Sequence, residues 1–314
     1  MAKVLAILCS GRRNGYTATL LAEAAQAAEA ASDEVSVEVV RLHDYRFGPC
    51  TSCFGCIRDT EHRCTLDDDF GRKGQGALFL KVKEANGWIL ADPVHMWGPT
   101  AQCHLLMERC YPFVWSGELE GMPFASISCA TNQGMHMLAN REICKWAFTF
   151  GMRYIDGLAV HASHFQESLE ESGYLGQRLA EAALADAKDG RRKFGSDEER
   201  YLYYTDKPWS GFMPYMENLS QGSFRWQTSL MEKALRHNSF KNQEAVELLK
   251  KAGEEFQKAI RFYNLNDYEN ANTHLVKASS FWTHATWKEF LEEQVIRSAP
   301  PKVYRPLPDM NEEK

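Results

Sequence analysis

Five short strand-like segments, separated by helical patterns, constrain the fold of this chain more than any other feature. They are residues 4–8, 35–42, 87–91, 124–129 and 154–160, and the intervening residues 18–31, 102–111 and 135–150 have helical hydrophobic spacing. Strands that alternate with helices pair in parallel, because each helix returns the chain to the same end of the sheet. We predict an α/β fold with a doubly wound, five-stranded parallel sheet, whose ligands gather beyond the carboxyl ends of the strands.

A polar glycine loop follows the first of these segments. Residues 10–17 have the sequence SGRRNGYT. A glycine turn between a strand and a helix points backbone N–H groups at an anion, and the hydroxyls of Ser10 and Thr17 with the Arg12 guanidinium would complete a phosphate site. The loop matches neither the nucleoside triphosphate motif nor G-x-G-x-x-G, and a plain turn without a ligand remains an alternative.

Two further loops belong to the same edge of the predicted sheet. Residues 92–100 contain Pro93, Val94, His95, Met96, Trp97 and Gly98, which offer large flat side chains to an aromatic ring. Residues 130–135 contain Thr131, Asn132 and Gly134, which offer hydrogen bonds to the polar edge of such a ring. Phosphate in one loop and a planar heterocycle between the other two indicate flavin mononucleotide (FMN).

Four cysteines lie within fifteen residues, at Cys50, Cys53, Cys56 and Cys64. The spacing C-x2-C-x2-C-x7-C brings three thiolates to one short loop and a fourth from just beyond, as a 4Fe-4S cluster requires. Zinc usually takes two separated C-x2-C pairs, so zinc fits less well and remains an alternative, as do inert or redox-active thiols. The other five of the nine cysteines are expected to be small buried side chains.

Taken in order, these motifs resemble the iron–sulfur flavoprotein branch of the NADPH-dependent FMN reductase, flavodoxin-like family. The resemblance covers about residues 1–190 and is most specific at the cysteine set and the following Thr65-Leu66-Asp67-Asp68-Asp69. It implies FMN in the three loops and a 4Fe-4S cluster on the four cysteines. It assigns phosphate-loop roles to Ser10, Arg12, Asn14, Gly15, Tyr16 and Thr17, and isoalloxazine-loop roles to Pro93, Val94, His95, Met96, Trp97 and Gly98.

The chain departs from the family pattern at three positions of these two loops. Gly11, Tyr16 and His95 stand where family members commonly have Pro, Asn and Tyr, respectively. His95 is our candidate catalytic residue, because an imidazole beside the flavin can donate a proton near neutral pH.

Charge and hydropathy exclude two classes of partner. A net charge of −6 and a pI near 6.0 leave no basic footprint for nucleic acid. No run approaches 18 consecutive apolar residues, and the N-terminal MAKVLAIL passes directly into a polar loop, so we expect no membrane span and a soluble, cytoplasmic protein.

The amino-acid composition of the chain changes beyond about residue 190. We predict a flavodoxin-like FMN-binding domain over residues 1–190, with the cluster loop at 50–64, and an aromatic-rich linker plus α-helical extension over residues 191–314. Apolar stripes at residues 245–263 and 268–282 predict two amphipathic helices that pack or build a homo-oligomer, either a dimer or a tetramer. The proline-rich residues 298–314 are expected to be extended or disordered.

These features together predict an iron–sulfur flavoprotein oxidoreductase. Electrons would pass from reduced ferredoxin or NAD(P)H, through the cluster and FMN, to a small acceptor. Two alternatives stay open at this level, namely an electron carrier without a substrate of its own and a redox-responsive protein-binding module.

Overall fold

The computed structural model describes residues 1–296, which form two compact units. The first unit comprises Met1–Cys56, Glu61–Phe194 and Lys207–Trp209, and the second comprises Ile57–Thr60, Gly195–Asp206 and the chain from Ser210 onward. The tail predicted at residues 298–314 lies outside the described residues. Within residues 1–296, no helix combines the length and the apolar character that a membrane span requires.

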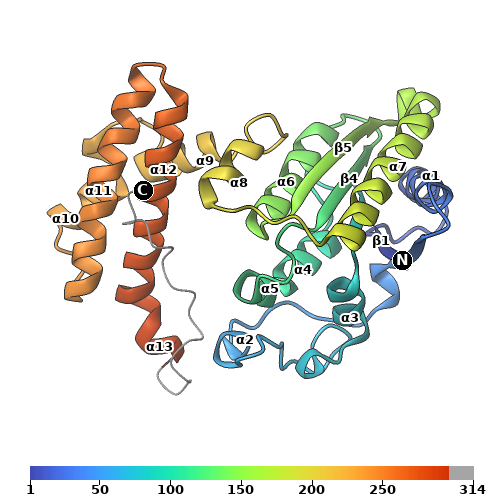
Figure 1. Ribbon diagram of the computed structural model, residues 1–314, viewed down its shortest axis with the longest axis horizontal. Helices are drawn as coiled ribbons and strands as arrows, with labels where there is room; N and C mark the ends of the chain where they lie inside the picture. Colours follow the sequence, from blue (N-terminus) through green and yellow to red (C-terminus); the bar gives the residue numbers. More distant parts are fainter. Residues whose placement is uncertain (297–314) are drawn as a thin grey trace. The chain divides into compact units, whose positions relative to one another are not determined.

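A five-stranded parallel sheet forms the centre of the first unit (Figure 1). Its strands are β1 (Ala2–Leu8), β2 (Val35–Arg41), β3 (Gly87–Pro93), β4 (Pro123–Ala130) and β5 (Arg153–His161), in the spatial order β2-β1-β3-β4-β5. The chain moves outward from β1 to β2 and then returns to the other side of β1 with β3. Doubly wound sheets bind ligands at such a switch point. The predicted flavodoxin-like sheet is confirmed.

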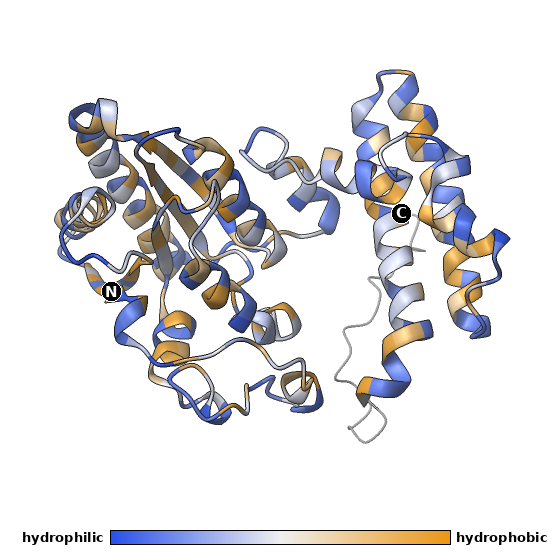
Figure 2. Cartoon of the chain, turned by 180° about the vertical axis from the view of Figure 1, so that it is seen from behind, coloured by the Kyte–Doolittle hydropathy of each residue, from blue (hydrophilic) through white to orange (hydrophobic). Residues whose placement is uncertain are grey.

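Helices cover both faces of this sheet. They are α1 (Tyr16–Ala30), α3 (Ala77–Glu84), α4 (Ala101–Arg109), α5 (Tyr111–Ser116), α6 (His136–Thr149) and α7 (Phe165–Asp189), with the single-turn α2 (Gly55–Arg58) in the cysteine loop. Val4, Ala6 and Leu8 share one hydrophobic cluster with α1 and α7, whereas the alternate residues Leu5 and Ile7 are buried on the opposite face. The inner strands β1, β3 and β4 are therefore almost wholly buried, whereas the edge strands β2 and β5 also carry polar residues such as Glu38 and Asp156. The helices carry a polar side as well (Figure 2).

Close packing fixes α1 against α7. Gly176 of α7 lies so near α1 that a Cβ atom there would stand 1.9 Å from the carbonyl oxygen of Ala24. One helical turn away, Ser172 Oγ donates to the carbonyl of Leu20 at 2.7 Å. The first turn of α1, which follows the polar glycine loop, is thus held by a rigid helix pair.

The second unit is helical, as predicted for the C-terminal extension. It contains α8 (Asp197–Tyr203), α9 (Phe212–Ser220), α10 (Leu230–Arg236), α11 (Gln243–Asn264), α12 (Tyr268–Thr286) and α13 (Glu292–Ile296). The two predicted stripes form α11 and α12, which pack against each other and bury Leu249, Phe256 and Leu275 in a common core. Helices α8 and α9 pack against α12.

Candidate functional site

The sheet brings the three predicted FMN loops together at one edge. Strands β1, β3 and β4 are neighbours, so the loops that follow them start side by side. The pairing continues past the strand ends, because the Cys9 amide donates to the carbonyl of Ala91 at 2.9 Å and the Val94 amide donates to the carbonyl of Cys129 at 2.9 Å. The three loops therefore begin from a rigid base.

The first loop presents an uncapped helix N-terminus. Gly15 is the N-cap of α1 and supplies no side-chain acceptor, and the first turn of α1 contains no acidic residue. Ser10 Oγ accepts from the Arg12 amide at 3.1 Å, while the side chain of Arg12 is exposed. Open backbone N–H groups beside a hydroxyl and a guanidinium match a phosphate dianion. The residues present therefore fit the FMN phosphate.

The second loop projects two large side chains from the sheet edge. His95 and Gly98 exchange backbone hydrogen bonds of 3.0 and 3.1 Å, which closes a tight turn. Met96 and Trp97 occupy this turn with positive φ values of 49° and 68°, and they are 98% and 59% exposed. Exposed apolar side chains beside an anion site suit the packing of a flat aromatic ring. His95 is exposed in the same turn.

The third loop is held by a histidine from β5. Asn132 lies in the left-handed region with φ 62°, and its carbonyl accepts a hydrogen bond of 3.0 Å from His161 Nε2. The rings of His136 and His164 lie 5.8 and 6.5 Å from that of His161. Burial, together with the charges of the two other histidines, lowers the pKa of His136. Thr131 is exposed on this loop and Gly134 adopts φ 87°.

All four motif cysteines border one cavity of about 960 Å³ within the first unit. The loop that carries them is irregular, with left-handed residues at Ser52 (φ 51°) and Phe54 (φ 54°). Residues of α4, α5 and α6, including His104, Tyr111 and Trp146, line the same cavity. The predicted metal ligands therefore border a common space.

The thiols of this cavity influence one another. Burial, followed by the negative charges of the three other motif thiols, raises the pKa of Cys56 to about 12. At Cys53 a hydrogen bond from the Gly55 amide lowers the pKa, even though partial burial opposes this effect. Four thiolates so close together need a positive centre to offset their repulsion. An iron–sulfur cluster or another metal centre would supply that charge.

Arg109 at the end of α4 holds the cysteine loop in place. Its side chain is 1% exposed and forms a paired hydrogen bond with Asp68, through Nη1 to Oδ2 at 2.5 Å and Nη2 to Oδ1 at 2.9 Å. Nη1 also donates to the carbonyl of Gly48 at 2.7 Å, and Nη2 lies 3.4 Å from the Sγ of Cys64. Sequence reasoning missed this residue. The sequence feature that could have identified it is a charged side chain among the apolar positions of a predicted helix.

The three aspartates that follow Cys64 have different roles. Asp68 pairs with Arg109 and also accepts hydrogen bonds from the amides of the loop at Phe70 and Gly71. Asp69 accepts from the Arg46 amide at 2.7 Å, and Asp67 is 92% exposed beside Arg72. Asp68 and Asp69 therefore organise the loop backbone.

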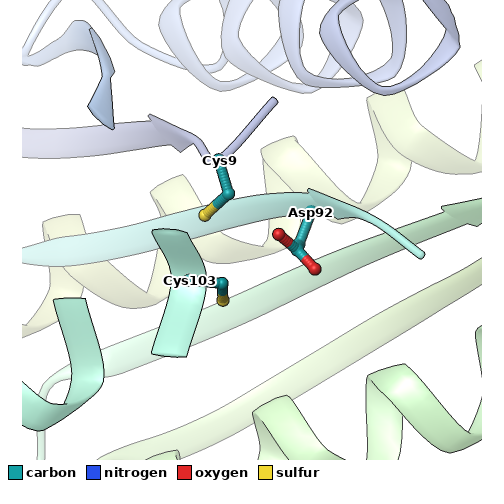
Figure 3. A group of neighbouring side chains, drawn as sticks. All are labelled: Cys9, Asp92 and Cys103. Carbon is teal, nitrogen blue, oxygen red and sulfur yellow. The ribbon is translucent and has the colours of Figure 1, made fainter. Parts of the chain in front are cut away.

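A separate group of buried side chains lies at the carboxyl ends of β1 and β3 (Figure 3). Cys9, Asp92 and Cys103 place their sulfur and oxygen atoms within 4.8 Å of one another. Asp92 accepts from the amide and the hydroxyl of Thr100, at 2.9 and 2.5 Å. Burial raises the pKa of Asp92 to about 7. Cys110, Cys129 and Cys144 are buried as well, which confirms the prediction for the five remaining cysteines.

Replacing Arg109 should destabilise the cysteine loop. Arg109→Met leaves the Asp68 carboxylate without its buried partner, and we expect the free energy of unfolding to fall by about 3 kcal/mol. Arg72→Met is the matched control, because Arg72 and Asp67 are 52% and 92% exposed. An exposed pair contributes about 1 kcal/mol or less. Urea denaturation and limited proteolysis of residues 45–75 measure both variants. Equal losses in the two would contradict the assigned role.

Asp92 should make stability depend on pH. Its pKa rises from 3.8 when exposed to about 7 in the fold, so the folded state binds an extra proton between these values. Stability is then fully present below about pH 4 and is lost as the pH rises through 7, by on the order of 4 kcal/mol. Asp92→Asn should remove this slope. Asp156→Asn, at a 49% exposed aspartate of β5, should keep it. The midpoints of urea denaturation between pH 4 and 8 measure the pH dependence of each variant. An unchanged slope in Asp92→Asn would contradict the assignment of this dependence to Asp92.

Comparison with known proteins places the first unit in a family. The model of the NADPH-dependent FMN reductase family matches residues 2–167. An iron–sulfur flavoprotein of Methanocaldococcus jannaschii is 36% identical over 110 residues, which is 35% of this chain and 52% of that protein. An iron–sulfur flavoprotein of Archaeoglobus fulgidus is 31% identical over 111 residues, again 35% of this chain and 52% of that protein. The chain thus spans about half the length of the curated relatives it matches.

Among solved structures, a flavone reductase aligns with a TM-score of 0.46 at 17% identity, over 63% of this chain and 69% of that one. The matches to two iron–sulfur flavoproteins confirm the branch resemblance that the cysteine set predicted. Because the family model covers more than half of the residues, the chain belongs to the NADPH-dependent FMN reductase family.

Proposed function

We propose that this protein is an iron–sulfur flavoprotein oxidoreductase, which transfers electrons from reduced ferredoxin or NAD(P)H to a small acceptor. One observation carries the proposal: the unit whose sheet edge presents the three FMN loops also gathers four cysteines around a single cavity. In this proposal residues 1–190 form the cofactor-binding domain, and residues 191–314 comprise the aromatic-rich linker plus the α-helical extension.

The spacing of the thiols along the chain favours a cluster over a single zinc ion. Zinc usually takes two separated C-x2-C pairs, whereas C-x2-C-x2-C-x7-C brings three thiolates to one short loop and a fourth from just beyond, as a 4Fe-4S cluster requires.

The chain's own residues then have defined tasks. Cys50, Cys53, Cys56 and Cys64 would hold the cluster, and Arg109 would place a permanent positive charge beside Cys64. Ser10, Arg12 and the first turn of α1 would bind the FMN phosphate, while Met96 and Trp97 would cover the ring. When bound, the cluster carries single electrons and FMN accepts one or two, which links one-electron donors with two-electron acceptors.

His95 is the residue proposed to move a proton. Its exposed position in the turn of the second loop leaves the imidazole accessible to an acceptor that lies over the loops. An imidazole can take up a proton and, once protonated, release it again, which a phenol in the same place does less readily.

The cluster is tested by analysis of anaerobically purified protein. We expect broad absorbance near about 400 nm and stoichiometric iron and sulfide. Cys56→Ala should lose most of the iron and sulfide yet retain FMN, because the FMN loops lie elsewhere on the sheet edge. Cys110→Ala is the matched control, since this buried cysteine lies outside the motif. Zinc in place of iron in the native protein, or full iron content in Cys56→Ala, would refute the cluster.

The FMN site is tested with two neighbouring arginines. Arg12→Gln removes the proposed charged contact to the phosphate, and we expect about tenfold weaker FMN binding. Arg13→Gln is the matched control, because the Arg13 guanidinium instead pairs with Asp44 at 3.0 Å. Titration of the apoprotein with FMN, followed by flavin fluorescence, measures both affinities. Equal effects of the two substitutions would argue against the assigned phosphate site.

A further inference from the structure

The polar glycine loop at residues 10–17 is braced by residues at the end of the neighbouring strand β2. Arg41 is the last residue of β2 and lies opposite Leu8 where β1 pairs with β2. Its Nη1 atom donates a hydrogen bond of 2.8 Å to the carbonyl of Gly11. The ring of His43 lies against the same residue, 3.4 Å from where a Cβ atom on Gly11 would stand. The loop therefore packs against the end of β2 at Gly11.

The Arg41 guanidinium is itself held in a fixed position. Its Nε donates to Asp44 Oδ2 at 3.3 Å, and its Nη2 donates to Asp44 Oδ1. These hydrogen bonds lower the pKa of Asp44, so the carboxylate is charged at neutral pH. The Arg41 side chain is 17% exposed. Because the guanidinium is planar and its other two nitrogens are engaged by Asp44, Nη1 is directed at the loop backbone.

The contact at Gly11 also determines how the next peptide group and Ser10 are oriented. In a trans peptide the carbonyl and the following N–H point in opposite directions. With the Gly11 carbonyl on Arg41, the Arg12 N–H points the other way and donates to Ser10 Oγ at 3.1 Å. A hydroxyl that accepts a hydrogen bond keeps its own proton for donation. The hydroxyl proton of Ser10 is therefore available to a phosphate oxygen, and the Gly11 carbonyl does not repel that oxygen, because it is paired with a cation.

We propose that Arg41 is a positioning residue for this loop, and that it strengthens the preference of the protein for FMN over riboflavin. It acts on the phosphate through Gly11 and Ser10, without touching the ligand. This inference rests on the proposed function, to which it adds a residue outside the three FMN loops.

The test compares FMN with riboflavin, which has the same ring system but no phosphate. Titration of the apoprotein with each ligand, followed by flavin fluorescence, gives the ratio of the two affinities. In Arg41→Met we expect FMN to bind about tenfold more weakly, while riboflavin binding changes by less than about twofold. A native protein without any preference for FMN would overturn the proposed phosphate site together with this inference. A native preference that Arg41→Met retains in full would overturn the inference alone.

Arg153→Met is the matched control for a general loss of stability. The Arg153 side chain is 12% exposed, and it likewise donates to a glycine carbonyl, that of Gly121 at 2.8 Å, and pairs with Asp186 at 2.5 Å. It begins β5, at the end of the sheet opposite to the FMN loops. Arg153→Met should lower the melting temperature but leave the ratio of the two affinities unchanged. An equal loss of FMN preference in the two variants would overturn the inference.

A double-mutant cycle tests whether Arg41 acts through Ser10. Ser10→Ala removes the hydroxyl that Arg41 orients, so adding Arg41→Met should weaken FMN binding by less than about threefold further. A full tenfold loss in the Ser10→Ala background would overturn this route.

Arg41→Lys provides a second variant if Arg41→Met does not fold. One ammonium can serve the Gly11 carbonyl or Asp44 but cannot form the paired contact, so the affinity ratio should still fall by at least about threefold. An unchanged ratio in Arg41→Lys would overturn the inference in that case.

Discussion

The cysteine loop depends on one buried ion pair, between Arg109 and Asp68. The loop has little regular structure of its own, and it contains residues in the left-handed region. A single guanidinium gathers three parts of it, namely the carbonyl of Gly48, the carboxylate of Asp68 and the sulfur of Cys64. Because Arg109 ends a helix that packs beside the sheet, the pair transmits the rigidity of the sheet to a loop that could not hold four thiols in place alone.

The architecture follows from local patterns, and therefore much of it could be predicted. Each strand of the sheet is a short apolar run, and the order of a doubly wound sheet then places the loops after β1, β3 and β4 together. The apolar stripes of α11 and α12 repeat at the helical period, so these two helices could also be predicted from the sequence. The four cysteines could be grouped from sequence because their ligand spacing is itself local.

Long-range partners could not be predicted. Arg109 and Asp68 are separated by 41 positions, and nothing in the sequence distinguishes Asp68 from Asp67 or Asp69. Their roles differ because the backbone turns one carboxylate inward and leaves another 92% exposed. The approach of Cys9 to Cys103 and Asp92 depends in the same way on how α4 packs against the sheet. Tertiary packing selects among residues that local patterns treat as equivalent.

The open first turn of α1 has a thermodynamic consequence. Five of the described α-helices are closed by side-chain caps, at Thr100, Ser196, Ser229, Asn242 and Asp267, whereas α1 is among those that begin without one. Omitting such a cap leaves a helix less stable by about 1 kcal/mol. A bound phosphate would supply the missing acceptor, and any ligand that binds only the folded state adds about 2.7 kcal/mol of stability at 100 times its Kd. Flavin binding and folding of the first unit are then linked. The concentration of flavin would therefore influence what fraction of this protein is folded.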